Sequence, residues 1–189
     1  MKKTAIALTL IAAFLVFSGC SKDNPTNATN DTTAQDFVPL PLAVGNTWIY
    51  ETNTGYDTIK VTGLMQVNNQ ALYVLDDDWL WDNDACYYSN GILYGRKLND
   101  STSTEIVFPK NPIIGQTWIT SQAAQATWVL QSNSDQISVP AGTYTCYRII
   151  VRWPESTWYY WWTNGKGIIK MADSANTANA FKLVSITLN

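Results

Sequence analysis

Histidine is missing from the 189-residue chain, and charged residues make up only 14% of it. Without histidine there is no Ser-His-Asp or Cys-His nucleophile, no imidazole general base and no histidine-ligated zinc or haem. We therefore expect no enzymatic activity, no bound metal and no cofactor. Aromatic residues are abundant instead, with nine Trp and ten Tyr, and apolar residues reach 46%. Such a chain has enough apolar surface for one folded domain.

The N-terminal residues have the layout of a secretion signal. Two lysines precede an apolar run over residues 5–17, which is shorter than the roughly 20 residues that span a bilayer. Residues 17–20, Phe-Ser-Gly-Cys, resemble the lipobox of bacterial lipoproteins, in which Leu is the commonest first residue. The resemblance implies cleavage before Cys20 and lipid chains on Cys20, and Ser21 in place of an inner-membrane retention Asp implies the outer membrane. The alternative is an uncut N-terminal anchor helix.

Cleavage at this point also changes the net charge. It removes two of the 12 basic residues and leaves the 15 acidic ones, so the net charge moves from −3 to −5. An acidic surface repels a phosphate backbone, and we expect no nucleic-acid partner. No basic cluster remains that could bind a membrane surface. Membrane attachment therefore depends on the lipid of Cys20.

Residues 21–36 consist almost wholly of Ser, Thr, Asn, Asp and Ala, a composition typical of a flexible tether. We divide the chain into a cleaved signal peptide over residues 1–19, a lipidated cysteine and disordered tether over residues 20–36, and a β domain over residues 37–189. We expect a monomer held at the periplasmic face of the outer membrane or at the cell surface.

From residue 37 onward, apolar and polar residues alternate in short segments between turn residues, which is the period of β-strands. We expect an all-β domain with little helix, in which about ten strands form a single curved antiparallel sheet closed into a half-barrel or barrel. Asn90-Gly91 and Asn164-Gly165 predict hairpins with primed turns, and Asn68-Asn69 is a weaker signal of this kind. The expected strands are Thr47–Thr52, Asp57–Met65, Ala71–Asp76, Ala85–Ser89, Ile92–Leu98, Thr117–Ile119, Ala126–Gln131, Cys146–Trp153, Trp158–Thr163, Gly167–Met171 and Phe181–Leu188.

Residues 41–50 (PLAVGNTWIY) and residues 112–120 (PIIGQTWIT) echo each other. Pro, Gly, Thr, Trp and Ile recur in order, with one extra residue after the proline of the first copy. One explanation is a duplicated unit, in which the glycine permits a turn and the tryptophan enters the core. The other is coincidence in an aromatic-rich chain. We favour the duplicated unit, and neither explanation makes it a catalytic motif.

Four segments together resemble a known pattern. They are residues 41–48, which read Pro-Leu-x-x-Gly-Asn-x-Trp, residues 139–147 (VPAGTYTCY), the aromatic residues 158–162 and residues 165–170 (GKGIIK). This pattern is similar to one that recurs in uncharacterised bacterial lipoproteins, and the match covers most of residues 39–172. The resemblance implies a curved antiparallel sheet of the kind shared with periplasmic lipoprotein carriers and lipid-binding lipoproteins.

Cys86 and Cys146 remain once Cys20 carries lipid. An even pair of cysteines in an oxidising envelope favours a disulfide. Such a bond would close a 60-residue loop and contribute about 3 to 4 kcal/mol by chain-entropy estimates. The alternative is two buried free thiols, since spacing does not show whether the two side chains face each other.

The stretch from Asp76 to Asp84 (DDDWLWDND) holds five carboxylates within nine residues. Carboxylate oxygens are ligands for Ca²⁺, but the glycine and the glutamate of an EF-hand loop are missing. Paired carboxylates also serve glycoside hydrolysis, which needs a set gap that this spacing does not show. We favour a solvated connection between strands and predict no metal site there.

The aromatic segment around residue 160 is rich enough to suggest a binding surface. In a strand, Trp158, Tyr160 and Trp162 point one way, and Tyr159 and Trp161 point the other. One set belongs to the core, and the other is covered by a neighbouring loop, lines an apolar cavity or stacks on sugars.

We select as candidate ligand-binding residues Trp153, Trp158, Tyr160 and Trp162. The leading hypothesis is a non-enzymatic, membrane-anchored envelope lipoprotein that holds a lipid or another hydrophobic ligand against these rings. The alternative is a carbohydrate-contacting or structural envelope module that uses exposed aromatic side chains.

Overall fold

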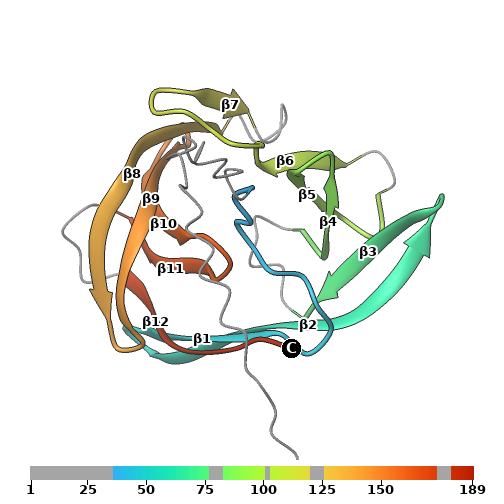
Figure 1. The fold of residues 1–189 in the computed structure, drawn as a ribbon, viewed down its shortest axis with the longest axis horizontal. Helices are drawn as coiled ribbons and strands as arrows, with labels where there is room; N and C mark the ends of the chain where they lie inside the picture. The colour runs from blue at the N-terminus through green and yellow to red at the C-terminus, as the bar shows by residue number, and fades with distance from the viewer. Residues whose placement is uncertain (1–35, 77–82, 101–102, 120–125, 174–179) are drawn as a thin grey trace, which may run out of the picture. The chain divides into compact units, whose positions relative to one another are not determined.

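The computed structural model describes residues 36–76, 83–100, 103–119, 126–173 and 180–189. These residues form one strongly curved sheet of twelve antiparallel strands (Figure 1), which confirms the expected all-β, barrel-like fold. Within these ranges there is no helix, and so none that could cross a membrane. The strands are β1 (Thr47–Thr52), β2 (Gly55–Val67), β3 (Gln70–Leu75), β4 (Ala85–Ser89), β5 (Ile92–Arg96), β6 (Thr104–Phe108), β7 (Thr117–Ile119), β8 (Thr127–Val139), β9 (Gly142–Arg152), β10 (Thr157–Thr163), β11 (Gly167–Ala172) and β12 (Ala180–Thr187).

The sheet is open between two strands that follow each other in the chain. Its order is β6-β5-β4-β3-β2-β1-β12-β11-β10-β9-β8-β7, so β1 pairs with β12, and the edges are β6 and β7. The strands form two six-stranded meanders, β1–β6 and β7–β12, and the second strand of each has 13 residues. Across the seam, the ring centroids of Phe108 on β6 and Trp118 on β7 lie 6.1 Å apart. An aromatic contact therefore bridges the two edges.

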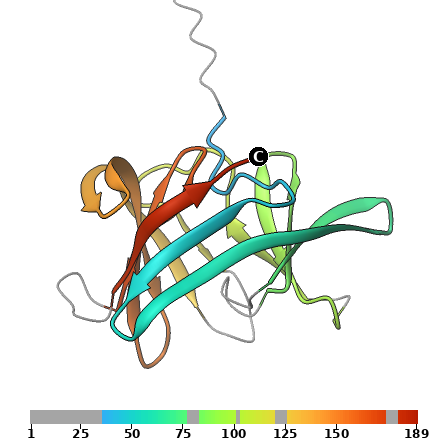
Figure 2. The ribbon, with the colours of Figure 1, turned by 90° about the horizontal axis from the view of Figure 1, so that it is seen from below.

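The two ends of the barrel carry different connections. Because successive strands run in opposite directions, the connections alternate between the ends. One end holds the start of β1, the end of β12 and the turns from each even-numbered strand to the next strand. Residues 36–46, which we call the strap, run across this strap end, and the C-terminus lies at the same end (Figure 2). The opposite end, which we call the far end, holds the remaining connections, including residues 153–156 between β9 and β10.

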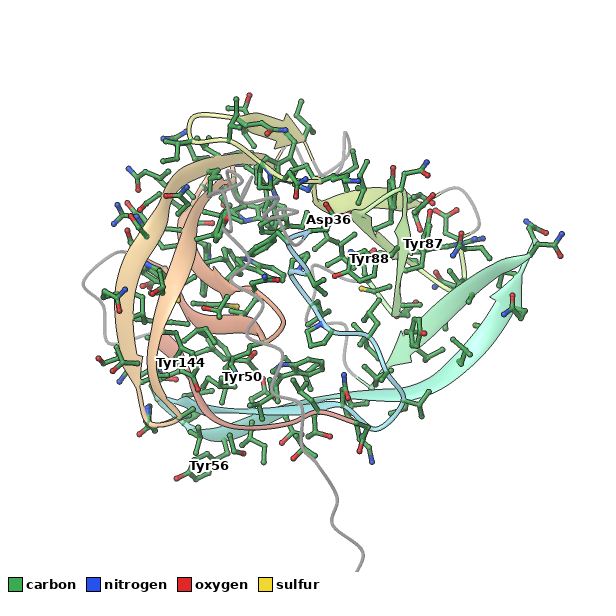
Figure 3. All side chains as sticks on the ribbon, viewed as in Figure 1. Asp36, Tyr50, Tyr56, Tyr87, Tyr88 and Tyr144 are labelled. Atoms are coloured by element: carbon green, nitrogen blue, oxygen red, sulfur yellow. The ribbon has the colours of Figure 1, made fainter. Side chains whose placement is uncertain are left out.

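The strap joins opposite walls of the barrel. The ring of Phe37 stacks on Phe108 of β6 and contacts Tyr147 of β9, with ring centroids 5.0 and 4.2 Å apart. The N–H of Leu40 donates to the hydroxyl of Tyr88 on β4 (Figure 3), and that hydroxyl donates to the Leu40 carbonyl, over 3.1 and 2.8 Å. Phe37 and Leu40 of the strap therefore contribute to the core.

The turn between β10 and β11 binds the strap with two hydrogen bonds. The Oδ1 of Asn164 accepts the N–H of Val38 at 2.7 Å, and the N–H of Gly165 donates to the Val38 carbonyl at 2.8 Å. The predicted hairpin is present, but of Asn164 and Gly165 only the glycine has a positive φ (68°), so the expected primed turn is wrong. The longer turn leaves the Asn164 side chain to hold the strap.

The other two predicted hairpin turns are present in the expected form. Asn90 and Gly91 have φ values of 52° and 80° between β4 and β5. Asn68 and Asn69 have φ values of 50° and 63° between β2 and β3. Both central residues of each turn have a positive φ, as a type I′ turn requires.

The echo between residues 41–50 and 112–120 is one structural unit used twice. In each copy the glycine has a positive φ, 95° and 88°, and its N–H donates to a carbonyl of the following long strand at 2.8 Å. A tryptophan three residues later is buried. The duplicated unit is thereby confirmed. The corresponding contacts are Gly45 with Val61 on β2 and Gly115 with Leu130 on β8, and the corresponding tryptophans are Trp48 and Trp118.

Two parts of the sheet differ from the expectation. Strand β6 was not expected, because its apolar residues, 106–108, are consecutive and do not alternate. Strand β8 continues past Gln131 through the polar residues 132–136. Its pairing with β9 shifts register there, at Ser132 and Asp135. Backbone hydrogen bonds hold this part of the strand in the sheet. Because its side chains are polar, the sequence shows no alternation of apolar residues that would predict it.

We predict that Phe37→Ala lowers the free energy of unfolding by about 2 to 3 kcal/mol, because it removes a half-buried ring that packs on both walls. Urea unfolding followed by tryptophan fluorescence measures this change. The control is Tyr56→Ala at the far end, where the side chain is exposed, and we expect a change within about 0.5 kcal/mol. Equal effects of the two substitutions would contradict the role given to the strap.

Candidate functional site

Strand β10 presents aromatic side chains on both faces of the sheet. Its residues alternate, so Trp158, Tyr160 and Trp162 share one face and Tyr159 and Trp161 share the other. The first set faces the interior, since Trp162 contacts Phe108, the ring on which Phe37 of the strap stacks. The question of which aromatic face belongs to the core is thereby answered.

Tyr160 and Trp162 both pack in the core. The ring of Trp162 meets Phe108 edge to face at 5.4 Å, and Tyr160 stacks on Trp128 at 5.7 Å, both measured between ring centroids. Both side chains are buried. Neither offers a free ring face to a ligand.

Trp153 and Trp158 occupy a different position. They lie at the far end, around the connection 153–156, and both are half-buried against the edge of the core. Trp158 is directly opposite Val151 on β9. At about 3.3 Å per residue, Trp158 lies roughly 13 Å along the strand from Trp162. The structure therefore divides the four candidate residues into two core residues and two residues at the far end.

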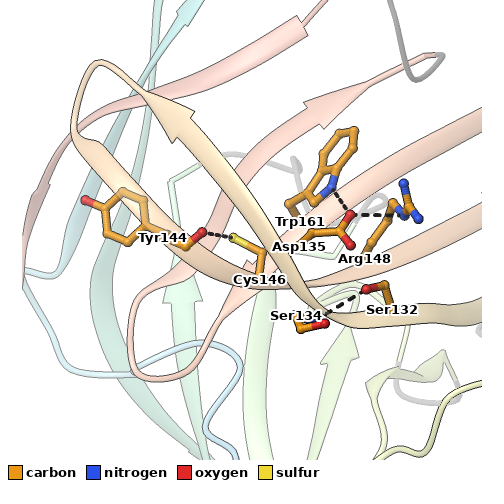
Figure 4. A network of polar contacts seen from close by, with 7 residues as sticks. All are labelled: Ser132, Ser134, Asp135, Tyr144, Cys146, Arg148 and Trp161. Carbon is orange, nitrogen blue, oxygen red and sulfur yellow. Dashed lines mark hydrogen bonds and ion pairs between the residues drawn. The ribbon is translucent and has the colours of Figure 1, made fainter.

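On the opposite face of β10, Trp161 is covered by a polar network (Figure 4). Its indole N–H donates to Oδ2 of Asp135 at 3.2 Å, and the same oxygen lies 3.2 Å from Nε of Arg148. The ring of Tyr159 stacks beside it at 6.1 Å. Trp161 is only 3% exposed. This face of β10 therefore gives a sugar little of the Trp161 ring to stack on.

Lys170 completes the cover of Trp161. Its Nζ lies 4.9 Å from the centroid of the Trp161 ring, a distance at which a cation is attracted to the ring. Lys170 is directly opposite Lys182 on β12. Burial lowers the pKa of Lys170, and the charge of Lys182 lowers it further. Sequence reasoning did not single out this contact, because it depends on the pairing of β10 with β11.

The predicted disulfide between Cys86 and Cys146 is wrong, because both residues are free thiols. Six strands separate β4 from β9 in the sheet order. Cys146 lies on the face of β9 opposite to Tyr147, which contacts the strap, and its Sγ is 3.2 Å from Oγ1 of Thr163. Cysteines on different walls do not meet the distance that a disulfide requires.

Burial makes both thiols poor nucleophiles. It raises the pKa of Cys86 to about 12. Burial also raises the pKa of Cys146 to about 11, while the hydrogen bond with Thr163 lowers this pKa and the charge of Asp135 raises it. The reactive form of cysteine is the thiolate, so both groups are protonated and inert near neutral pH.

Residues 77–82 of the acidic stretch Asp76 to Asp84 lie outside the described residues. At its start, Oδ1 of Asp76 accepts the N–H of Lys60 at 2.6 Å. At its end, Oδ2 of Asp84 accepts the N–H of Leu98 at 2.8 Å. These two carboxylates therefore bind backbone N–H groups, one on β2 and one just after β5. Among the residues that the structure describes, no three Cys, Asp or Glu side chains are grouped to hold a metal ion.

The signal peptide, Cys20 and most of the tether lie outside the described residues, so their roles stay predictions. The described domain begins with Asp36 at the strap end. The Nδ2 of Asn111 donates to Oδ1 of Asp36 at 3.3 Å, and Nζ of Lys110 lies 3.6 Å from Oδ2. The chain therefore reaches the domain beside the connection between β6 and β7.

No protein-family model matches the chain, and no curated protein does. Two solved structures are similar to it. One, described as an exported protein with a YmcC-like fold from Bacteroides fragilis, has a TM-score of 0.45 and 12% identity, and the match covers 80% of this chain and 100% of that chain. The other, described as a lipoprotein from Parabacteroides distasonis, has a TM-score of 0.38 and 14% identity, with coverage of 80% and 99%. These scores are too low to carry a function to this chain.

We predict that Cys86 and Cys146 of a Cys20→Ala variant resist alkylation in the folded protein and that both react in denaturant without reductant. Mass spectrometry counts the added groups. The opposite outcome is that the denatured protein is alkylated only after it is reduced. That result would show that a disulfide joins Cys86 and Cys146.

We also predict that the free energy of unfolding falls as the pH rises in the alkaline range. Because both thiol pKa values are raised in the fold, the folded state keeps its protons while the unfolded chain releases them from about pH 9. The stabilisation is therefore complete below about pH 9 and is lost as the pH rises toward about 11 and 12. Urea unfolding at several pH values measures the slope, and a double Cys86→Ala, Cys146→Ala variant should show a flatter one.

Proposed function

We propose that this chain is a non-enzymatic lipoprotein of the outer membrane, anchored through Cys20, whose barrel binds a hydrophobic molecule at its far end. One observation carries the binding. Tyr160 and Trp162 are buried in the core, whereas Trp153 and Trp158 are half-buried at the end opposite the strap. The second pair is therefore the pair available to a ligand.

The sequence supports the anchor. Residues 17–20 resemble a lipobox, and the apolar run before them is too short to span a bilayer. Several acyl chains on one residue, at about 0.8 kcal/mol per buried methylene, hold a protein on a membrane without further contacts. The position of Asp36 at one end of the barrel is compatible with a tether that leads from the lipid to the domain.

The arrangement of the two ends supports a hydrophobic ligand at the far end. The strap crosses the other end, where Phe37 and Leu40 contact the walls. Indole rings offer large apolar areas, and binding sites for small molecules are lined mainly by such side chains. The cover on Trp161 disfavours the alternative, in which this face of β10 stacks on carbohydrate.

Two features support a function without catalysis. The chain has no histidine to act as a general base. Both described thiols have a pKa well above neutral, so neither supplies a thiolate nucleophile. These features disfavour catalysis by histidine or cysteine and support binding as the proposed role of the domain.

We predict that Cys20→Ala moves the protein from the membrane fraction to the soluble fraction, because it removes the acceptor of the lipid. Fractionation with an alkaline wash, followed by mass measurement of the membrane form, tests this. Cys86→Ala is the matched control and should stay with the membrane. Retention of the Cys20→Ala protein after the wash would contradict the lipid anchor and favour an uncut helix.

We predict that acyl lipid co-purifies with the protein from membranes and that a Trp153→Ala, Trp158→Ala variant retains several-fold less of it. Extraction and lipid mass spectrometry provide the measurement. Tyr159→Ala is the control, because Tyr159 is half-buried on the same strand but on the other face. A thermal melt of each variant shows whether the fold is kept.

Equal lipid in the two variants would contradict the proposed site. A second outcome would favour carbohydrate as the ligand in place of a hydrophobic molecule. In that outcome the unaltered protein carries no lipid and glycans quench its tryptophan fluorescence.

A further inference from the structure

Several exposed apolar side chains lie at the strap end, where the chain enters the domain. Ile113 and Ile114, between β6 and β7, are 73% and 59% exposed. Val44, just before β1, is 49% exposed, and Leu188, just after β12, is 42% exposed. A single exposed apolar side chain is ordinary on a protein surface. Four such residues lie on three segments around this end, and we call them the apolar rim; at the far end Tyr56, Leu98 and Ile119 are exposed as well.

The duplicated unit places two parts of the apolar rim opposite each other. Val44 and Ile114 each directly precede the positive-φ glycine of their turn, Gly45 and Gly115. The two turns lead into β1 and β7, and five strands separate β1 from β7 in either direction around the barrel. A flat apolar surface placed against the strap end would meet both turns at once.

The chain enters the domain at the same rim. Asp36 contacts Lys110 and Asn111, which lie within three residues of Ile113. From there the strap runs to Val44, at the opposite side of the strap end. Fifteen residues lie between Cys20 and Asp36, and the sixteen steps along this chain reach at most roughly 55 Å. A lipid on Cys20 therefore holds the apolar rim within reach of the bilayer.

We propose that the strap end rests on the bilayer that holds the lipid anchor, with the apolar rim in the interfacial layer of that bilayer. This inference rests on the proposed lipidation of Cys20. Tethering raises the effective concentration of the rim at the membrane, so a few apolar side chains suffice for contact that they could not maintain alone. The net charge of −5 after cleavage gives no overall attraction to anionic lipids, so the contact is apolar. The far end, with Trp153 and Trp158, then faces away from this membrane.

The experiment places one fluorophore on the lipidated chain and measures its contact with lipid. Single cysteines are introduced as Ile113→Cys, Val44→Cys or Tyr56→Cys and labelled with an environment-sensitive dye. Cys86 and Cys146 are buried, so we expect them not to react in the folded protein, and the proposed lipidation blocks the thiol of Cys20. One dye per molecule therefore also shows that the variant is folded. The proteins are reconstituted into phosphatidylcholine vesicles with brominated acyl chains, which quench a dye that reaches them.

We expect the dyes at positions 113 and 44 to shift to shorter wavelength and lose most of their emission. The dye at position 56 should keep its emission. Tyr56 is a matched control, because it is 73% exposed, as Ile113 is, and lies at the start of β2 and so at the far end; Figure 3 shows it on the outside of the sheet. Similar quenching at the three positions, or none at positions 113 and 44, would overturn the docking.

Flotation of the vesicles separates this outcome from failure of the anchor. Protein that floats with the vesicles but shows an unquenched dye at position 113 overturns the docking and leaves the lipid anchor intact. Protein that does not float overturns the anchor, and the docking with it.

Discussion

The interior of a twelve-stranded sheet must be filled, and the rest of the structure depends on how this is done. About eight strands already enclose a space that ordinary side chains fill, and the space grows with strand number. This chain fills it with large rings and with its own strap. Phe37 enters between Phe108 and Tyr147, and Trp128 and Trp162 are fully buried. Part of the excess of tryptophan in the composition, including Trp128 and Trp162, is therefore a consequence of barrel size.

Filling the barrel from one end makes its two ends different. At the strap end, the backbone of the strap is bound by Asn164 and Tyr88, and the C-terminal Asn189 donates its N–H to Asn46 at 2.8 Å. Rings at the far end, Trp153 and Trp158, have no such cover from the strap and stay half-buried. The proposed anchor, the apolar rim and the proposed ligand site follow from this polarity, because the chain enters at one end and the half-buried indoles of Trp153 and Trp158 lie at the other.

The two meanders share a design but differ where they meet. β12 and β1 join through a ladder of backbone hydrogen bonds, whereas β6 and β7 meet through the rings of Phe108 and Trp118. The two faces of β10 also pack differently. Trp161 lies on the face opposite the core and is nevertheless buried, because Asp135 and Lys170 cover it. A residue's burial here thus reflects its neighbours across the sheet as much as its own side of the strand.

The sequence by itself determined the all-β class, most strand positions and the turns at Asn68-Asn69 and Asn90-Gly91, because alternation and turn preference are local properties. It also predicted the duplicated unit, whose glycine and tryptophan act through nearby backbone. Only the tertiary structure decided that Cys86 and Cys146 stay apart and that the strap crosses the barrel. It also decided that Trp162 belongs to the core and that Trp158 lies at the far end. These outcomes depend on which strands become neighbours when the sheet closes, and a period of two residues is the same for every order of strands.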